Sequence, residues 1–72
     1  MTEQAFTSGE VAQMCAVSKT TVIRWVDSGR LSAFQTPGGH RRVLARELYH
    51  FMKRYGIPVP EVVVKAARRV LQ

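Results

Sequence analysis

The feature that most constrains this chain is a pair of short helix-forming segments separated by a turn of only a few residues. Thr7 and Glu10 have the spacing of a capping box, in which each side chain accepts a hydrogen bond from the other residue's backbone N–H, so a helix is predicted to begin here. Its apolar residues follow at i, i+3 and i+4 spacing and are Val11, Ala12, Met14 and Cys15. The apolar pattern stops at 16–17, so this first helix is short.

A second short helix is predicted from Ser18 to about Ser28. Ser18 is an N-cap candidate, and Gly29 suits the C′ position because glycine adopts the left-handed conformation without a steric penalty. The apolar residues of this helix share one face and are Val22, Trp25 and Val26. The remaining face is polar and cationic and carries Lys19, Thr20, Thr21 and Arg24.

A small β-hairpin and a third helix are predicted to follow. Residues 31–36 alternate loosely like a strand, the run Pro37-Gly38-Gly39 is a strong turn signal, and residues 40–44 return as the second strand. The third helix is predicted to stop at Gly56, with Pro58 shortly beyond. Its apolar stripe consists of Leu44, Leu48, Phe51, Met52 and Tyr55.

The C-terminal segment, residues 58–72, admits more than one interpretation. One helical stripe is available and consists of Val63, Ala66, Ala67, Val70 and Leu71, whereas residues 62–64 are a β-branched run of lower helix propensity. A helix is favoured, because Glu61 near its start and basic residues toward its end suit the helix dipole. We expect either a linker toward a further domain after residue 72 or a short helix that packs on the core or mediates dimerisation.

The first two predicted helices fit the pattern of a helix-turn-helix. Ala12 is the small residue that allows the two helices to cross, about four residues before the turn. With Ser8 as the first position, the apolar positions of the motif all hold apolar residues, namely Val11, Cys15, Val17, Val22 and Trp25. Ala16 stands where many such motifs have Gly, so the turn is predicted to be either strained or slightly different in geometry.

Charge favours nucleic acid as the partner. Eleven Lys and Arg residues against five Asp and Glu residues give a formal net charge of +6, which suits a polyanion, although a solvated basic surface is the alternative. A domain of about this size buries only roughly 60% of its unfolded surface, so a sizeable catalytic cleft is not expected. We therefore expect a protein that is not an enzyme.

Composition also argues against several kinds of site. Cys15 is the single cysteine, so no intrachain disulfide forms, and with His40 and His50 it supplies too few ligands for a structural zinc site. No cofactor or metal is expected. The first residues do not resemble a secretory signal, and no stretch approaches the roughly 20 apolar residues of a membrane span. A cytoplasmic protein with no membrane partner is the expectation.

Residues Phe6 to Ile57 resemble the DNA-binding domains of the MerR superfamily, especially its excisionase-like branch, which includes BldC-like regulators. Two motifs carry the resemblance, the pattern Ser8-x-x-Val11-Ala12 to Val17-Ser18-x-x-Thr21-Val22-x-x-Trp25 and the wing-like run Thr36-Pro37-Gly38-Gly39-His40-Arg41-Arg42. The resemblance implies a winged helix-turn-helix domain over residues 6–57, mainly α with a small β-hairpin wing, in the order helix, helix, hairpin, helix. Residues 58–72 then form the linker or short C-terminal helix.

The resemblance also implies a function, namely sequence-specific binding of double-stranded DNA by a bacterial transcription regulator or its DNA-binding module. A recognition helix over about 18–28 would enter the major groove, and a wing over about 36–43 would lie on the backbone or in the minor groove. The residues expected to contact DNA are Ser18, Lys19, Thr20, Thr21, Arg24, His40, Arg41 and Arg42. One recognition helix covers few base pairs, so a homodimer or a head-to-tail multimer on DNA is expected.

Two other functions are compatible with the same scaffold. An excisionase-like architectural factor would bend DNA, and a protein–protein adaptor would use the same surface for a partner, although cationic residues on both helix and wing disfavour the adaptor. RNA binding is less favoured, because the chain lacks a set of surface aromatics suited to stacking bases. Trp25 and Cys15 are expected in the core, and Arg42 alternatively forms an ion pair with Glu47 or Asp27.

Overall fold

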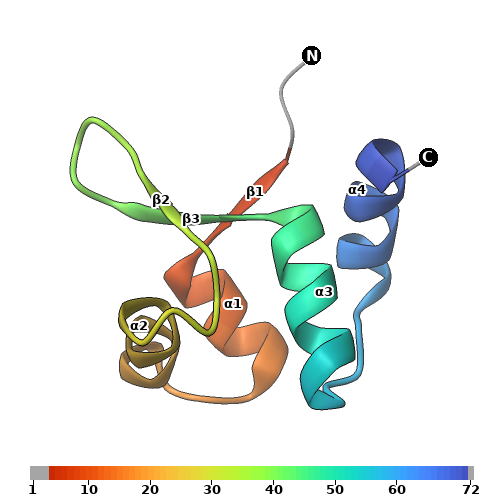
Figure 1. Ribbon diagram of the computed structural model, residues 1–72, viewed down its shortest axis with the longest axis horizontal. Helices are drawn as coiled ribbons and strands as arrows, with labels where there is room; N and C mark the ends of the chain where they lie inside the picture. Colours follow the sequence, from red (N-terminus) through yellow and green to blue (C-terminus); the bar gives the residue numbers. More distant parts are fainter. Residues whose placement is uncertain (1–3, 72) are drawn as a thin grey trace.

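The structure is a computed structural model that describes residues 4–71. The side chains of Val70 and Leu71, which belong to the predicted apolar stripe of the C-terminal segment, lie outside the described part. Over these residues the elements are β1 (Ala5–Thr7), α1 (Ser8–Cys15), α2 (Lys19–Asp27), β2 (Phe34–Gln35), β3 (Arg41–Leu44), α3 (Ala45–Tyr55) and α4 (Glu61–Leu71). In Figure 1 the strands cross above α1 and α2, and the β2–β3 hairpin projects away from the α3–α4 pair. The domain is therefore mainly helical with a small sheet, as the sequence predicts.

The two predicted helix starts are confirmed by their caps. The Thr7 backbone N–H donates to the Glu10 carboxylate at 2.8 Å, and the Glu10 N–H donates to the Thr7 hydroxyl at 3.0 Å. The Ser18 hydroxyl accepts from the Thr21 N–H at 3.2 Å and starts α2. Because each cap satisfies N–H groups that lack a partner inside the helix, both short helices have fixed first residues.

The turn between α1 and α2 takes the strained alternative. Ala16 has φ 58° and ψ 43°, a left-handed conformation in which its Cβ crowds the backbone. Its N–H donates to the Gln13 carbonyl at 3.2 Å, and the Val17 N–H donates to the Ala12 carbonyl at 3.0 Å. These two bonds close the C-terminus of α1 and turn the chain abruptly into α2.

The core is assembled from every part of the described chain. Its largest fully buried side chains are Leu31, Leu48, Met52, Val11, Val22, Val43 and Val63. Trp25 packs against this core as predicted, with its ring centroid 4.9 Å from that of Phe51. Tyr55 was expected within the apolar stripe of α3 but is 47% exposed, because it lies at the last position of the helix. Its ring packs on Phe51, with 4.8 Å between the ring centroids.

The sheet has three antiparallel strands in the order β1-β3-β2 rather than the predicted two. Strand β1 was not predicted, since three residues are too few to show an alternating pattern; it pairs Phe6 with Val43. The predicted strand over 31–36 is reduced to Phe34–Gln35, because Leu31 turns into the core and its N–H donates to the Trp25 carbonyl at 3.1 Å. Strand β3 therefore lies at the centre of the sheet.

The predicted hairpin, called the wing here, comprises β2, β3 and the connecting residues 36–40. Gly39 has φ 83°, a left-handed conformation that glycine tolerates at this turn. The Thr36 N–H donates to the His40 carbonyl and the Gly39 N–H to the Thr36 carbonyl, each at 2.8 Å. The tip is thus closed by backbone bonds.

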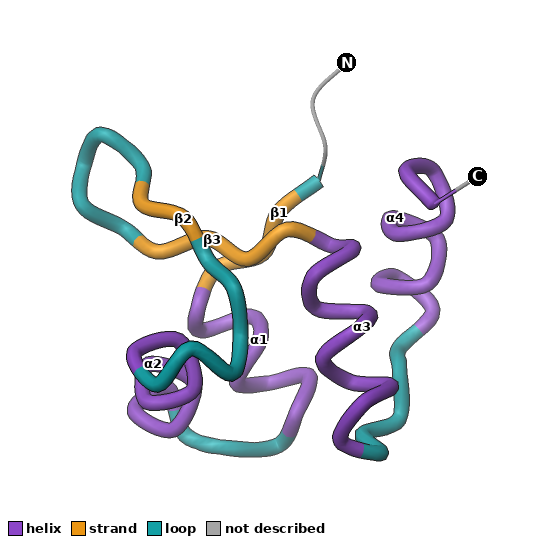
Figure 2. The backbone as a smooth tube through the Cα atoms, in the orientation of Figure 1, coloured by secondary structure: helices purple, strands orange, loops and turns teal. Residues whose placement is uncertain are grey.

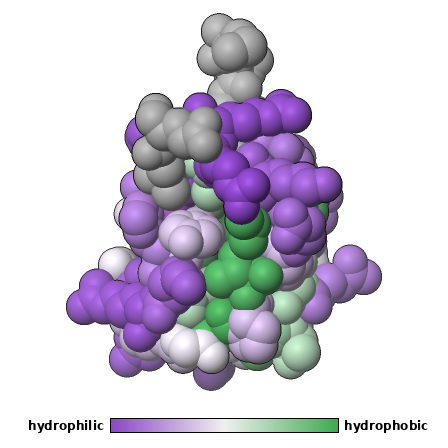
Figure 3. All heavy atoms as spheres, turned by 90° about the vertical axis from the view of Figure 1, so that its right-hand side faces the viewer, coloured by the Kyte–Doolittle hydropathy of each residue, from purple (hydrophilic) through white to green (hydrophobic). Residues whose placement is uncertain are grey.

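The C-terminal segment adopts the helical alternative. Helix α4 runs beside α3 (Figure 2), and its residues Val63, Ala66 and Ala67 are buried in the domain core or against it. Figure 3 looks onto this side of the molecule, where an apolar strip is bordered by hydrophilic side chains. Val62, one residue before Val63, is 49% exposed.

Among the described residues, no helix has both the length and the apolar character needed to cross a membrane.

The burial of α4 predicts that its contact with α3 contributes to stability. Val63→Ala removes two methyl-sized groups from a fully buried site and is expected to lower the free energy of unfolding by about 2 kcal/mol. Val62→Ala is the matched control, with the same gain in helix propensity at a half-exposed site, and is expected to change it by less than about 0.5 kcal/mol. Urea unfolding followed by Trp25 fluorescence measures the free energy of unfolding of both variants. Equal losses in the two variants would show that the contact of α4 with α3 does not contribute to stability.

The left-handed turn predicts a stabilising substitution. Ala16→Gly removes the Cβ that crowds the backbone and is expected to raise the free energy of unfolding by about 0.5–1 kcal/mol, after the greater chain entropy of glycine is allowed for. Ala66→Gly, inside α4, is expected to have the opposite sign, with a loss of at least about 1 kcal/mol. Thermal unfolding of both variants checks this, and destabilisation by Ala16→Gly would disprove the strain.

Candidate nucleic-acid interface

Helix α2 presents most of its predicted contact residues to solvent. Ser18, Lys19, Thr20 and Arg24 are exposed, whereas Thr21 is half-buried. The Thr21 hydroxyl lies 3.0 Å from the Ser18 hydroxyl, and its backbone N–H also donates to Ser18, so these two side chains take part in the N-cap. The predicted contact residues that point outward on α2 are therefore cationic or hydroxylated, and Asp27 is the exposed acidic residue at the end of this helix.

The wing carries the other predicted contact residues. His40 is exposed at the end of the wing turn, and Arg41 and Arg42 begin the central strand β3 and are half-buried. The Arg42 guanidinium donates from Nη1 to the Arg41 carbonyl at 3.2 Å. Two guanidinium groups and an imidazole thus lie within three consecutive residues of the wing.

A groove of about 400 Å³ lies between the wing and the two short helices. Its lining residues, which define the wing groove, are Thr7, Ser8, Gly9, Lys19, Ile23, Gly39, His40, Arg41 and Arg42. Four predicted contact residues meet here, Lys19 from α2 and His40, Arg41 and Arg42 from the wing, whereas Ser18, Thr20, Thr21 and Arg24 lie elsewhere on α2. The fold therefore brings together cations that are about twenty residues apart in the sequence.

The groove also includes the start of α1 and Ile23, which the sequence pattern did not indicate as contact residues. Residues 7–9 are the N-cap and first turn of α1, where the helix dipole and backbone N–H groups favour an anion. The capping box located this helix start, but only the tertiary fold places it opposite the wing. Lysine, arginine and a helix N-terminus around one groove make its electrostatic potential positive.

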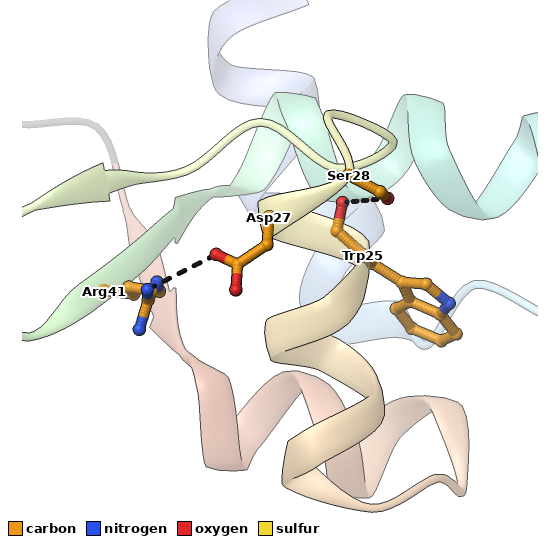
Figure 4. Close-up of polar contacts among 4 residues, drawn as sticks. All are labelled: Trp25, Asp27, Ser28 and Arg41. Atoms are coloured by element: carbon orange, nitrogen blue, oxygen red, sulfur yellow. Dashed lines mark hydrogen bonds and ion pairs between the residues drawn. The ribbon is translucent and has the colours of Figure 1, made fainter.

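An ion pair joins the wing to α2. Arg41 Nη2 lies 3.4 Å from Asp27 Oδ1 (Figure 4), with side-chain exposures of 35% and 61%. Asp27 was one of two alternative partners of Arg42, with Glu47, and the structure pairs it instead with the neighbouring Arg41. An exposed pair of this kind contributes less than about 1 kcal/mol, so it orients the Arg41 side chain more than it holds the fold.

Trp25 and Cys15 lie away from this surface. In Figure 4 the Trp25 indole points to the side of α2 opposite the Arg41–Asp27 pair. Cys15 packs partly against the core, and burial raises the pKa of its thiol, which disfavours the reactive thiolate. No group of three or more His, Cys, Asp or Glu side chains that could hold a metal ion gathers within residues 4–71.

Comparison with known families agrees with this architecture. A family model described as a helix-turn-helix domain matches residues 5–56. This chain belongs to the helix-turn-helix domain family. The match runs from β1 through α3 and includes the wing groove, whereas α4 follows it. No curated protein matches the chain. The helix-turn-helix is a DNA-binding motif, so membership of this family indicates DNA as the partner.

Proposed function

We propose that this helix-turn-helix domain is a sequence-specific double-stranded DNA-binding module of a bacterial transcription regulator, with the winged architecture of the MerR superfamily and its excisionase-like branch. One observation carries the proposal, the wing groove, in which Lys19 of α2 and Arg41 and Arg42 of the wing lie around one concave surface beside the N-terminus of α1. A phosphate backbone is the polyanion that this surface suits. The place of action would be the bacterial cytoplasm, where such DNA lies.

In this proposal α2 is the recognition helix and enters the major groove. Arg24 is exposed there and would donate two hydrogen bonds to guanine, and Thr20 and Lys19 would contact base edges or phosphates. Ser18 and Thr21, which form the cap, would direct the N-terminus of α2 to a phosphate. Sequence would thus be read by the exposed face of α2.

The wing would hold the module on the duplex. His40, Arg41 and Arg42 would contact the backbone or the minor groove, and the first turn of α1 would donate backbone N–H groups to a phosphate across the wing groove. Contacts on both sides of α2 would fix its orientation in the major groove. Cations on both α2 and the wing support DNA over a protein partner.

The proposal extends to domain organisation and assembly. Residues 6–57 would be the DNA-binding unit, and within residues 58–72 helix α4 buries Val63, Ala66 and Ala67. One recognition helix of nine residues contacts only a few base pairs, so two or more copies would bind together, as a homodimer or head to tail. Bending of the duplex by such an assembly would distinguish an excisionase-like factor from a regulator.

Titration of a randomised duplex pool at two salt concentrations, with sequencing of the bound fraction, tests the proposal. A motif should be recovered, and affinity should fall as salt rises. Arg24→Ala should weaken binding by about 1–3 kcal/mol and relax the base preference at one position of the motif. Arg41→Ala should weaken binding to all sequences alike and reduce the slope of log affinity against log salt concentration by about one.

Arg68→Ala is the matched control, because it removes the same charge from an exposed site on α4, on the other side of the molecule from the wing (Figure 1). Its affinity should stay close to that of the unsubstituted chain, since charges farther than about 10 Å are screened at 0.1 M salt. No enriched motif and no salt-dependent binding would reject DNA recognition and favour the adaptor.

Asp27 provides an independent prediction of opposite sign. Asp27→Asn removes the carboxylate that neutralises Arg41 at 3.4 Å, so duplex affinity is expected to rise on the order of fivefold at low salt. The free energy of unfolding should change by less than about 1 kcal/mol, because the pair is exposed. Fluorescence anisotropy with a labelled duplex measures the affinity, and unchanged or weaker binding would show that Arg41 does not meet phosphate.

A further inference from the structure

Ile23 is an apolar residue that the core does not use. It is half-buried on α2, and unlike its neighbours Trp25 and Val26 it does not belong to the half-buried apolar side chains that pack against the core. Instead it lines the wing groove, whose other side chains are polar or cationic. Its aliphatic side chain therefore belongs to the groove and not to the core cluster.

Helix geometry places Ile23 beside the exposed face of α2, which is proposed to contact bases. Ile23 follows the fully buried Val22 by one residue, a rotation of about 100° around the helix, so it lies at the edge between the core face and the outward face. It shares this side with Lys19 and Asp27, at i−4 and i+4. Asp27 forms the exposed ion pair with Arg41 of the wing, so this side of α2 faces the wing.

The chemistry of duplex DNA supplies one apolar group at such a position. The C5-methyl of thymine is the apolar feature of the major-groove edge, and aliphatic side chains recognise it by contact. It lies on the side of the base nearest its own backbone. A strand whose phosphate occupies the cationic wing groove would therefore present a pyrimidine C5 position to Ile23.

We propose that Ile23 is a specificity-determining residue that contacts the C5-methyl group of a thymine next to the phosphate bound in the wing groove. This inference rests on the proposed function. Lys19 and the wing cations hold the strand without regard to sequence, and Ile23 adds a preference for thymine over cytosine at one position. The apolar contact and the phosphate contact are made by the same groove.

Replacement of each thymine by deoxyuridine, in the duplex recovered from the randomised pool, tests this contact because it removes only the methyl group. At one thymine position per bound module, replacement by deoxyuridine should lower duplex affinity about fourfold. This is the effect expected for the loss of one buried methyl-sized group. In Ile23→Ala the same replacement should leave affinity unchanged, whereas Ile23→Val, which keeps both γ-carbons and loses only the δ-methyl group, should retain most of the effect. Val62→Ala, an apolar truncation on α4, should behave like the unsubstituted chain.

The outcomes separate this inference from the proposed function. A duplex that is bound with a sequence preference but is insensitive to every thymine replacement overturns the role of Ile23 and leaves DNA recognition intact. Sensitivity that persists in Ile23→Ala also overturns it. Absence of duplex binding overturns both. The deoxyuridine series on the unsubstituted chain requires no variant, so it decides the question even if Ile23→Ala does not fold.

Discussion

The pairing of β3 with both neighbouring strands is the interaction on which the rest of the structure depends. Strand β1 leads directly into α1, β3 leads directly into α3, and β2 and β3 form the wing. Val43 at the centre of the sheet is fully buried, and the Ala45 N–H continues the ladder to the Gln4 carbonyl at 3.0 Å. A strand of four residues thus fixes the wing relative to both α1 and α3, and the walls of the wing groove follow from it.

The wing groove combines strong but unspecific attraction with weaker and more selective features. Its arginines, lysine and helix N-terminus act on any polyanion, and their effect falls with salt. Asp27 offsets part of this charge at Arg41, which in the proposed complex would limit binding that ignores sequence. Arg24 on the outward face and Ile23 at the groove edge would be the residues that discriminate between bases. Attraction and discrimination would therefore come from different residues of one surface.

Local chemistry explains which predictions were confirmed. The cap at Thr7, the cap at Ser18 and the end of α3 at Gly56 each depend on residues within four positions of one another. The ion pair of Asp27 shows what local chemistry leaves open, because the sequence offered Asp27 as an alternative partner of Arg42 and the structure pairs it with Arg41. Arg41 and Arg42 are equivalent in sequence, and only the register of β3, with Phe34 opposite Arg42, decides which guanidinium reaches α2. Strand β1 escaped prediction because its stability comes from β3 and not from its own three residues.

The sequence by itself determined the helices, their caps, the wing turn and the excess of positive charge, because these follow from backbone sterics, hydrogen bonds between near neighbours and composition. Only the tertiary structure decided that α1 faces the wing, that α4 covers α3 and that Ile23 lines a groove and not the core. These outcomes depend on which apolar surfaces meet across long stretches of chain. Periodicity shows that a helix has an apolar face, but only packing selects what that face covers.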